Sequence, residues 1–590
     1  MAHHSLRTRL GVLLTAALLI SAGPLVAPAA AAPPGPVGNH ELRPFEPAAG
    51  EGPDVPAPKS NAPSRVPASH VPRVAGLPVG GATGVAARID GLTMQNQRDS
   101  NAGNSFSIEP PDQGLCAGNG LVIEGVNNVF AIYTSSGQQV SAPQSFDPFW
   151  NGVAEIVRHA DGTATFGPFV SDPKCYYDPA LNRFFMTELE IATDPNTGAF
   201  TGRSFEDLAV SKTSSPTTDP ADWHLYSLEV TNDGSNGTPE HPGCPCFGDQ
   251  PLIGADQYGF YISTNEFPIF TGGFNGAQLY AFDKAALTRG VMRVQRIENP
   301  STPLAEGTAY SVQPATSPSA GQWATAANGT EYFLSALEFT GGLDNRIATW
   351  ALTNTASLAT PNQNAQLSHV VITSEVYGAP PSASQRRGPT PLADALKYNK
   401  LELVNSNDDR MNQVVYAAGR LWSGLNTREQ GHTGATNAGI AYFVVTPNVG
   451  SGGLSATIAN QGYVAVDGNN VLFPAIGVND SGAAVLVFSL VGPSYYPSAA
   501  MVHLSPDGSI NSGVQIIQGG TKPDDGFSGY PAEGGAGIGR WGDYSAAVAD
   551  SSGRVWVATE YIPGTFGFPP YLANWGTFIA SVTPQSVPAP

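Results

Sequence analysis

The feature of this sequence that most constrains its fold is a short unit that recurs along the chain. Three segments align without gaps, and each has an aspartate that leads a turn, an alternating apolar strand and a closing glutamate. They are DPALNRFFMTE (178–188), DQYGFYISTNE (256–266) and DSSGRVWVATE (550–560). A further aspartate stands upstream of each segment, at Asp172, Asp249 and Asp543. Self-similarity of this kind predicts a repeat architecture.

Looser copies extend the series to seven units, which start near residues 112, 172, 249, 310, 410, 473 and 543. The units are spaced by roughly 60 residues, and further strand-like runs such as AQLYAFDK (277–284) follow each opening hairpin. About four strands in each of seven units predict an all-β, seven-bladed β-propeller. Six or eight blades also fit, because the middle units diverge. A β-sandwich array is the main alternative, but its units are nearer 100 residues long.

Composition agrees with an all-β fold. Charged residues make up only 13% of the chain, whereas it has 67 glycines and 51 prolines. This favours many short strands joined by turns over long helices. The net charge of -20 argues against nucleic-acid binding, which depends on basic side chains that neutralise phosphates. An acidic surface suits an exported protein, and one that takes up divalent cations.

The N-terminal part divides into three predicted regions. Residues 1–32 have a basic start, an apolar run and small residues near Ala31 and Ala32, as in a secretory signal peptide. Residues 33–79 are rich in proline, alanine and glycine and are predicted to be a disordered linker. Residues 80–590 form a single predicted propeller domain, and GVAARIDGLT (84–93) is a candidate for the strand that closes its ring. We expect a secreted, extracellular monomer with no membrane insertion.

The four cysteines are Cys116, Cys175, Cys244 and Cys246. In an oxidising compartment an even count favours disulfides, although the sequence does not reveal the pairing. A tight bridge between Cys244 and Cys246 is one option. The alternative is a soft-metal site formed by His241, Cys244 and Cys246 in the segment HPGCPC.

Propeller geometry brings some of the acidic residues together. The first two strands of a blade are antiparallel, so the start of the first and the end of the second lie on one face of the disc. Asp543 should therefore lie near Glu560 at one mouth of the central channel, as should Asp172 near Glu188 and Asp249 near Glu266. Arg410 is expected on the opposite side of that mouth, with Arg386 and Arg387 as further candidates. The turn aspartates Asp178, Asp256 and Asp550 should cap their own turns.

Three interpretations of the upstream acids remain open. Carboxylates in unequal environments serve as acid, base or nucleophile in glycoside hydrolysis, and the candidates are Asp543, Asp249, Asp172 and Glu560. Carboxylates with carbonyl groups instead hold Ca²⁺, a hard cation, although the sequence assigns no ligand set and no cofactor is certain. A structural role is the third interpretation, because a residue that recurs in every blade can belong to the blade itself.

The segment GRWGDY (539–544) departs from the other repeats. Arg540, Trp541 and Tyr544 surround Asp543 with a cation and two aromatic rings. Aromatic faces beside a carboxylate suit a sugar site, and arginine can bind a substrate carboxylate with two hydrogen bonds. The candidates for substrate binding are therefore Arg540, Trp541, Tyr544 and Arg410. The alternative is that Trp541 packs between blades and Arg540 pairs with an acid.

The blade pattern and the export signal resemble secreted bacterial propellers of the broad sialidase-like kind, over most of residues 105–585. The sialidase Asp-box is not matched by ADSSGRVW or ADQYGFY, which share only its aspartate and glycine, and the Phe-Arg-Ile-Pro motif is absent. The resemblance therefore implies the fold and not sialidase activity.

Together these observations predict an extracellular carbohydrate-active enzyme, a glycoside hydrolase or polysaccharide lyase, with its site at the channel mouth. Its partner would be a polysaccharide or glycoprotein substrate. The competing hypothesis is a secreted propeller without catalytic activity that binds a protein or glycan and is stabilised by Ca²⁺. An enzyme requires substrate-facing acids, whereas a binding scaffold does not.

Overall fold

The structure is a computed structural model that describes residues 66–298, 304, 305, 307–337, 342–432, 434–566 and 572–585. The predicted signal peptide (1–32) and the first part of the predicted linker (33–65) lie outside these residues, as does Glu338. Among the described residues, no helix combines the length and the apolar character that crossing a membrane requires.

Most described strands belong to seven four-stranded antiparallel groups, which we call units 1 to 7. Unit 1 contains β3 (Gly114–Gly118), β4 (Leu121–Val126), β5 (Val129–Thr134) and β6 (Gln144–Ser145). Unit 2 contains β9 (Phe169–Asp178), β10 (Arg183–Thr193), β11 (Phe200–Ser211) and β12 (Trp223–Glu229). Unit 3 contains β13 (Cys246–Ala255), β14 (Gly259–Pro268), β15 (Gly276–Asp283) and β16 (Val294–Glu298).

The next two units share an eight-stranded sheet, because their first strands pair in parallel through Ala315 and Val414. Unit 4 contains β17 (Gln313–Thr316), β18 (Thr330–Ala336), β19 (Leu343–Thr353) and β20 (Gln366–Gly378). Unit 5 contains β22 (Val414–Ala417), β23 (Arg420–Gln430), β24 (Thr436–Gly450) and β25 (Gly453–Val464). Unit 6 contains β26 (Asn470–Val478), β27 (Ala484–Gly492), β28 (Tyr495–Leu504) and β29 (Val514–Gln518), and β1 (Val79–Gly81) pairs with β29 in parallel.

Unit 7 is assembled from both ends of the chain. It contains β31 (Ala546–Ala549), β32 (Val555–Phe566), β33 (Leu572–Val582) and, as its outer strand, β2 (Val85–Thr93). Strand β2 pairs antiparallel with β33, with Ile89 opposite Ile579. The prediction that residues 84–93 complete the last unit is confirmed by this pairing. The pairing fixes one terminus against the other and leaves no open edge between them.

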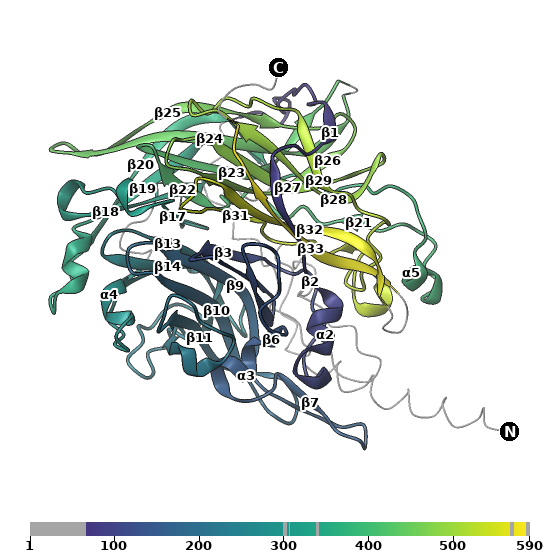
Figure 1. Cartoon of the computed structure of the whole chain (residues 1–590), viewed down its shortest axis with the longest axis horizontal. Coiled ribbons are helices and arrows are strands. Elements are labelled where there is room, and N and C mark those ends of the chain that lie inside the picture. The colour runs from purple at the N-terminus through teal and green to yellow at the C-terminus, as the bar shows by residue number, and fades with distance from the viewer. Residues whose placement is uncertain are drawn as a thin grey trace, which may run out of the picture.

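The first strands of the seven units form a closed ring. They contact one another in the order β3, β9, β13, β17, β22, β26 and β31, and β31 returns to β3. Several of these strands surround the middle of the molecule in Figure 1, and the other strands lie further out. Sheets arranged radially around a ring of inner strands make a β-propeller.

Apolar layers between neighbouring units hold the ring together. Between units 2 and 3, for example, Phe185 stacks on Phe260 with ring centroids 5.0 Å apart, and Tyr176 lies beside both. Every residue of β13 and β14 is buried. A strand covered on both faces needs few polar side chains, which explains the low charge content of the sequence.

The hairpin turns follow the predicted chemistry. Oδ1 of Asp178 accepts hydrogen bonds from the backbone N–H groups of Ala180 and Leu181, at 2.9 and 2.8 Å. Asp256 and Asp550 cap their turns in the same way. In unit 6 the capping residue is Asn479, since its Oδ1 accepts from the N–H of Ser481.

The remaining elements connect or flank the units. Two small sheets pair β7 (Ile156–Arg158) with β8 (Ala164–Phe166), and β21 (Leu403–Val404) with β30 (Ile538–Gly539). The α-helices are α2 (Met94–Gly103), α3 (Phe146–Asn151), α4 (Lys284–Leu287) and α5 (Pro391–Ala395). The described part of the predicted linker runs along units 4 and 5, where Val66 bridges to Leu343 and Arg73 to Gln430.

Candidate functional site

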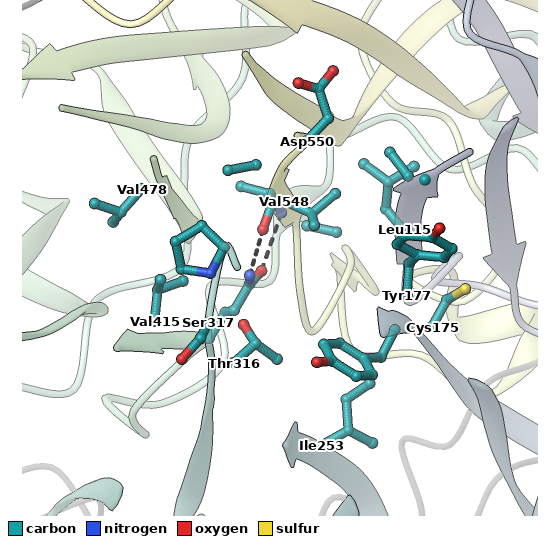
Figure 2. A pocket seen from close by; sticks show the side chains of 18 of the residues that line it. Leu115, Cys175, Tyr177, Ile253, Thr316, Ser317, Val415, Val478, Val548 and Asp550 are labelled. Atoms are coloured by element: carbon teal, nitrogen blue, oxygen red, sulfur yellow. Dashed lines mark hydrogen bonds between the residues drawn. The ribbon is translucent and has the colours of Figure 1, made fainter. Parts of the chain in front are cut away.

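A cavity of about 660 Å³ lies inside the ring of first strands. Its walls include apolar residues of several units, among them Leu115, Ile253, Val415 and Val478, and Figure 2 shows these side chains around one space. The hairpin turns that contain Asp550 and Asn479 also line it. The cavity therefore reaches the face that carries the turns. Its volume is typical of small-molecule sites.

Polar side chains line the cavity along its length. Away from the turns they come from the first strands and from the residues just before these strands, and they include Gln113, Lys174, Gln250, Arg410 and Tyr544. The turns are at the other ends of these strands, so these five residues lie toward the inner end of the cavity. Among the described residues that line the cavity, the only acids are Asp480 and Asp550, both at turns.

Two aspartates from distant units lie directly behind the inner end. The hydroxyl of Tyr544 donates a 2.7 Å hydrogen bond to Oδ1 of Asp172. Nε2 of Gln250 donates to Oδ2 of Asp543 at 3.2 Å, and its backbone N–H donates to Oδ2 of Asp172 at 3.3 Å. Tyr544 and Gln250 are thus each held by a buried carboxylate.

Asp112 of unit 1 completes this network. Its Oδ1 accepts from the backbone N–H of Asp543 at 2.8 Å, and its Oδ2 accepts from Nδ2 of Asn127 at 2.7 Å. Nδ2 of Asn407 donates to Oδ1 of Asp543, also at 2.8 Å. The start of unit 7 is therefore bonded to units 1, 2 and 3 and to the segment before unit 5.

Three cations, Lys174, Arg410 and Arg540, contact residues of this network. Nζ of Lys174 is 2.9 Å from the centre of the Tyr544 ring. Arg410 pairs with Asp408, with 2.7 Å between Nε and Oδ1, and lies over the ring of Tyr310. A guanidinium nitrogen of Arg540 is 3.7 Å from Oδ2 of Asp543. Cations on these aromatic faces interact with the ring electrons as well as with the acids.

Burial controls the protonation of the network. Burial raises the pKa of Asp112 to about 7, with a further contribution from the charge of Asp172, while Arg540 and two hydrogen bonds oppose the shift. Burial also raises the pKa of Tyr544 well above its usual value, and the charge of Asp172 adds to this. The Tyr544 hydroxyl is therefore protonated at neutral pH, in agreement with its hydrogen bond to Asp172.

The predicted catalytic residues occupy different positions. Asp543 and Asp172 lie in the network behind the inner end, and Asp249 precedes Gln250 with 8% of its surface exposed. Glu560 accepts a 2.7 Å hydrogen bond from the N–H of Gly542, next to Asp543. None of these four acids is among the described residues that line the cavity.

The other two closing glutamates lie beside their aspartates in the strand pairing. Glu188 is opposite the bulge that contains Asp172, and Glu266 pairs with Gly248 next to Asp249. Their carboxyl groups bond to other residues: Glu188 accepts from Nε1 of Trp150 at 3.2 Å, and Glu266 accepts from Nδ2 of Asn275 at 2.9 Å and pairs with His241.

Only two of the four residues predicted to bind substrate line the cavity. Tyr544 and Arg410 line the cavity. Trp541 does not, because it is buried in an apolar cluster with Phe473 and Ile562, so its predicted role as a substrate contact is corrected to packing between units. Arg540 pairs with Asp543 behind the wall. Arg386, predicted near the mouth, lies over the ring of Tyr496.

Several important residues were not predicted. Lys174 and Gln250 line the cavity although neither belongs to the repeat pattern. Asn127, Asn265 and Asn426 recur near the ends of second strands, and the Oδ1 of each accepts the backbone N–H of a residue in the next unit, at 2.7–2.8 Å. The residues that donate these bonds have positive φ angles: Asp172, Ser311 and Phe473. The recurring asparagine was a usable signal in the sequence.

Both disulfides are intramolecular. Cys116 of β3 pairs with Cys175 of β9 and joins the first strands of units 1 and 2, and Cys244 pairs with Cys246. Among the described residues, the only group of three potential ligands within 4.8 Å of one another is Cys244, Cys246 and Glu266. Because the disulfide occupies both sulfurs, this group does not provide the thiolates of a soft-metal site.

Comparisons with known proteins found no matching protein-family model and no matching curated protein. Solved structures with some similarity include a protein of unknown function from Dyadobacter fermentans, at 10% identity and a TM-score of 0.33, covering 70% of this chain and 95% of that one. An endo-arabinase from Bacteroides thetaiotaomicron has 10% identity and a TM-score of 0.24, with 81% and 96% covered. An exo-beta-1,3-galactanase from Phanerochaete chrysosporium has 11% identity and a TM-score of 0.25, with 85% and 97% covered.

Proposed function

We propose that the protein is a secreted, monomeric, seven-bladed β-propeller enzyme that acts on a polysaccharide or glycoprotein as a glycoside hydrolase or polysaccharide lyase. The reaction takes place at the inner end of the central cavity. The observation that carries the proposal is the hydrogen bond between Tyr544 and Asp172, because it puts a protonated hydroxyl on the cavity wall and a carboxylate directly behind it.

Tyr544 is the proposed general acid. Cleavage of a glycosidic bond requires a proton on the leaving oxygen, both in hydrolysis and in elimination. The high pKa of Tyr544 keeps its hydroxyl protonated, and Asp172 accepts a hydrogen bond from it and so fixes its direction. Asp172 is the proposed base and acts through Tyr544: it takes the hydroxyl proton of Tyr544 while the Tyr544 oxygen removes a proton from water or from the sugar carbon, and the same path then returns the proton from Asp172 through Tyr544 to the leaving oxygen.

The neighbouring side chains have supporting roles. Lys174 and Arg410 line the same wall and are placed to stabilise negative charge on the substrate or on the leaving oxygen. Asp543 positions Gln250, and Glu560 positions Asp543 through the backbone of Gly542. Asp249, which is next to Gln250, remains a second candidate for the base.

A screen of purified protein on neutral and acidic polysaccharides tests the proposal, with reducing ends and unsaturated products measured separately. The expected result is turnover of at least one glycan by the wild type and loss of that turnover in Asp172→Asn with the melting temperature kept. Reducing ends without unsaturation identify a hydrolase, and unsaturated products identify a lyase. Binding of a glycan or protein without turnover of any substrate overturns the enzyme proposal in favour of a binding propeller.

A further inference from the structure

A second group of acids lies where two long connecting segments meet, outside the central cavity. The segments are residues 379–413, between units 4 and 5, and residues 519–545, between units 6 and 7; β21 of the first pairs with β30 of the second. The group has five carboxyl side chains that expose at most 3% of their surface: Glu109, Glu402, Asp524, Asp525 and Glu560.

Two of the five are fully engaged by hydrogen-bond donors. Glu109 accepts from the backbone N–H groups of Phe527 and Ser528, at 3.0 and 2.9 Å. Asp525 accepts from the N–H groups of Leu392 and Ala393, at 2.6 and 3.1 Å. These two carboxyl groups have the donors that a buried anion requires and need no further partner.

Glu402 and Asp524 differ from them. Both carboxyl oxygens of Glu402 and Oδ2 of Asp524 are buried without a hydrogen-bond partner. Glu402 exposes only 1% of its surface, so solvent does not replace the missing donors. Leaving a buried acceptor unsatisfied is costly, and a buried charge more so, which calls for a neutralising partner.

These orphan oxygens face a common position. A Cβ atom built on Gly539 would lie 3.0 Å from Oδ2 of Asp524 and 3.2 Å from Oε1 of Glu402. A Cβ on Gly529 would lie only 1.9 Å from Oε2 of Glu402. Glycine is therefore required at position 529, where a Cβ would also lie 2.7 Å from the backbone nitrogen of Gly539, and the two carboxyl groups both lie against Gly539, which has no side chain.

The surrounding charges do not neutralise the pair. The charges that act most strongly on Glu402 are those of Asp524, Glu109 and Asp525, and together with burial they raise its pKa well above the usual value. Burial and the same neighbours raise the pKa of Asp524. Buried carboxyl groups in such a cluster are stable only when protons or a cation neutralise them, and a set of oxygen donors alone is the kind that Ca²⁺ prefers.

We propose that Glu402 and Asp524 bind a divalent cation, Ca²⁺, which ties the segment 379–413 to the segment 519–545. Backbone carbonyl oxygens and water complete the coordination. The segment 379–413 also contains Asn407 and Arg410, and the segment 519–545 also contains Arg540 and Asp543. The cation would therefore stabilise the floor of the central cavity without touching the cavity itself.

Calcium titration of EDTA-treated protein tests this inference. We expect one site by calorimetry and an increase of about 2–4 °C in the melting temperature at saturating Ca²⁺. Glu402→Gln and Asp524→Asn should each weaken binding by at least about tenfold and remove the increase, since an amide keeps the shape and loses the charge. Without Ca²⁺, Glu402→Gln should melt at or above the wild-type temperature.

Asp147→Asn is the matched control. Asp147 is equally buried, and both of its carboxyl oxygens also lack a partner, but it lies near Glu155 and Glu190 in a different acidic cluster. This variant should keep calcium binding. The inference is overturned if millimolar Ca²⁺ gives the wild type neither a binding heat nor an increased melting temperature. It is also overturned if Glu402→Gln or Asp524→Asn binds Ca²⁺ as the wild type does.

Discussion

The hydroxyl of Tyr544 donates a 2.7 Å hydrogen bond to Asp172, although 372 positions separate the two residues in the chain. Tyr544 lies two residues before β31 of unit 7 and Asp172 lies in β9 of unit 2, so the bond crosses unit 1. It joins the last unit of the chain to the second at the cavity wall. The proposed site is centred on this hydrogen bond.

Tyr544→Phe removes only the hydroxyl and should lower turnover by about 10²–10⁴-fold, which is the usual contribution of a general acid. The ring and its contact with Lys174 remain, so the melting temperature should change little. Rates on the responsive glycan measure the effect. Tyr177→Phe is the control, because Tyr177 lines the same cavity but its hydroxyl bonds to Asn182. Equal losses in both variants would contradict a special role for Tyr544.

The two disulfides should differ in their effect on stability. The Cys116–Cys175 bridge spans 59 residues and links two units, whereas Cys244–Cys246 spans two. A longer closed loop restricts the unfolded chain more, so replacing Cys116 and Cys175 by serine should cost about 2–4 kcal/mol. Replacing Cys244 and Cys246 should cost less. Denaturant unfolding of both double variants makes the comparison, and the reverse order would refute it.

The buried cation Lys284 should be essential for the contact between units 2 and 3. Its Nζ lies 2.6 Å from Oδ2 of Asp178 and 4.2 Å from the ring of Trp323. Lys284→Met leaves the buried carboxylate of Asp178 without its cation and should cost about 3–5 kcal/mol. Adding Asp178→Asn should restore part of the loss. The exposed Lys212→Met is the control and should change the free energy of unfolding by less than about 0.5 kcal/mol.

Glu375 should make the fold less stable at alkaline pH. Burial raises its pKa to about 8, and one of its carboxyl oxygens lacks a partner. A raised acid pKa means that the folded state binds a proton more tightly than the unfolded state does. Stability is therefore complete below the unfolded value near 4.5 and falls as pH rises toward 8, by at most about 1.4 kcal/mol per pH unit.

The variant Glu375→Gln removes this dependence because an amide does not ionise. It should match the wild type at pH 4 and be more stable than the wild type at pH 9. Unfolding free energies of both proteins across that range provide the measurement. Parallel curves for the two proteins would show that Glu375 ionises in the folded state as freely as in the unfolded state.

Sequence reasoning found the all-β class, the repeated hairpin and the closing strand because each is local. An aspartate that caps its own turn, as Asp178 does, needs only neighbours within three residues. The strand 84–93 was recognisable because the last unit lacked an outer strand. Trp541 was misplaced because its position depends on the layer between units that its side chain enters.

The sequence alone determined the repeating unit, the turn chemistry and the supply of acids, since these follow from short-range patterns. The tertiary structure decided which side chains face the cavity. Positive φ angles at Asp172 and Gln250 accompany shifts of register in β9 and β13. Each such bulge reverses the alternation of side chains beyond it, so Gln250 and not Asp249 lines the wall. The alternation of apolar and polar residues along the sequence does not predict that reversal, because hydrogen bonds to residues of other units fix the bulge.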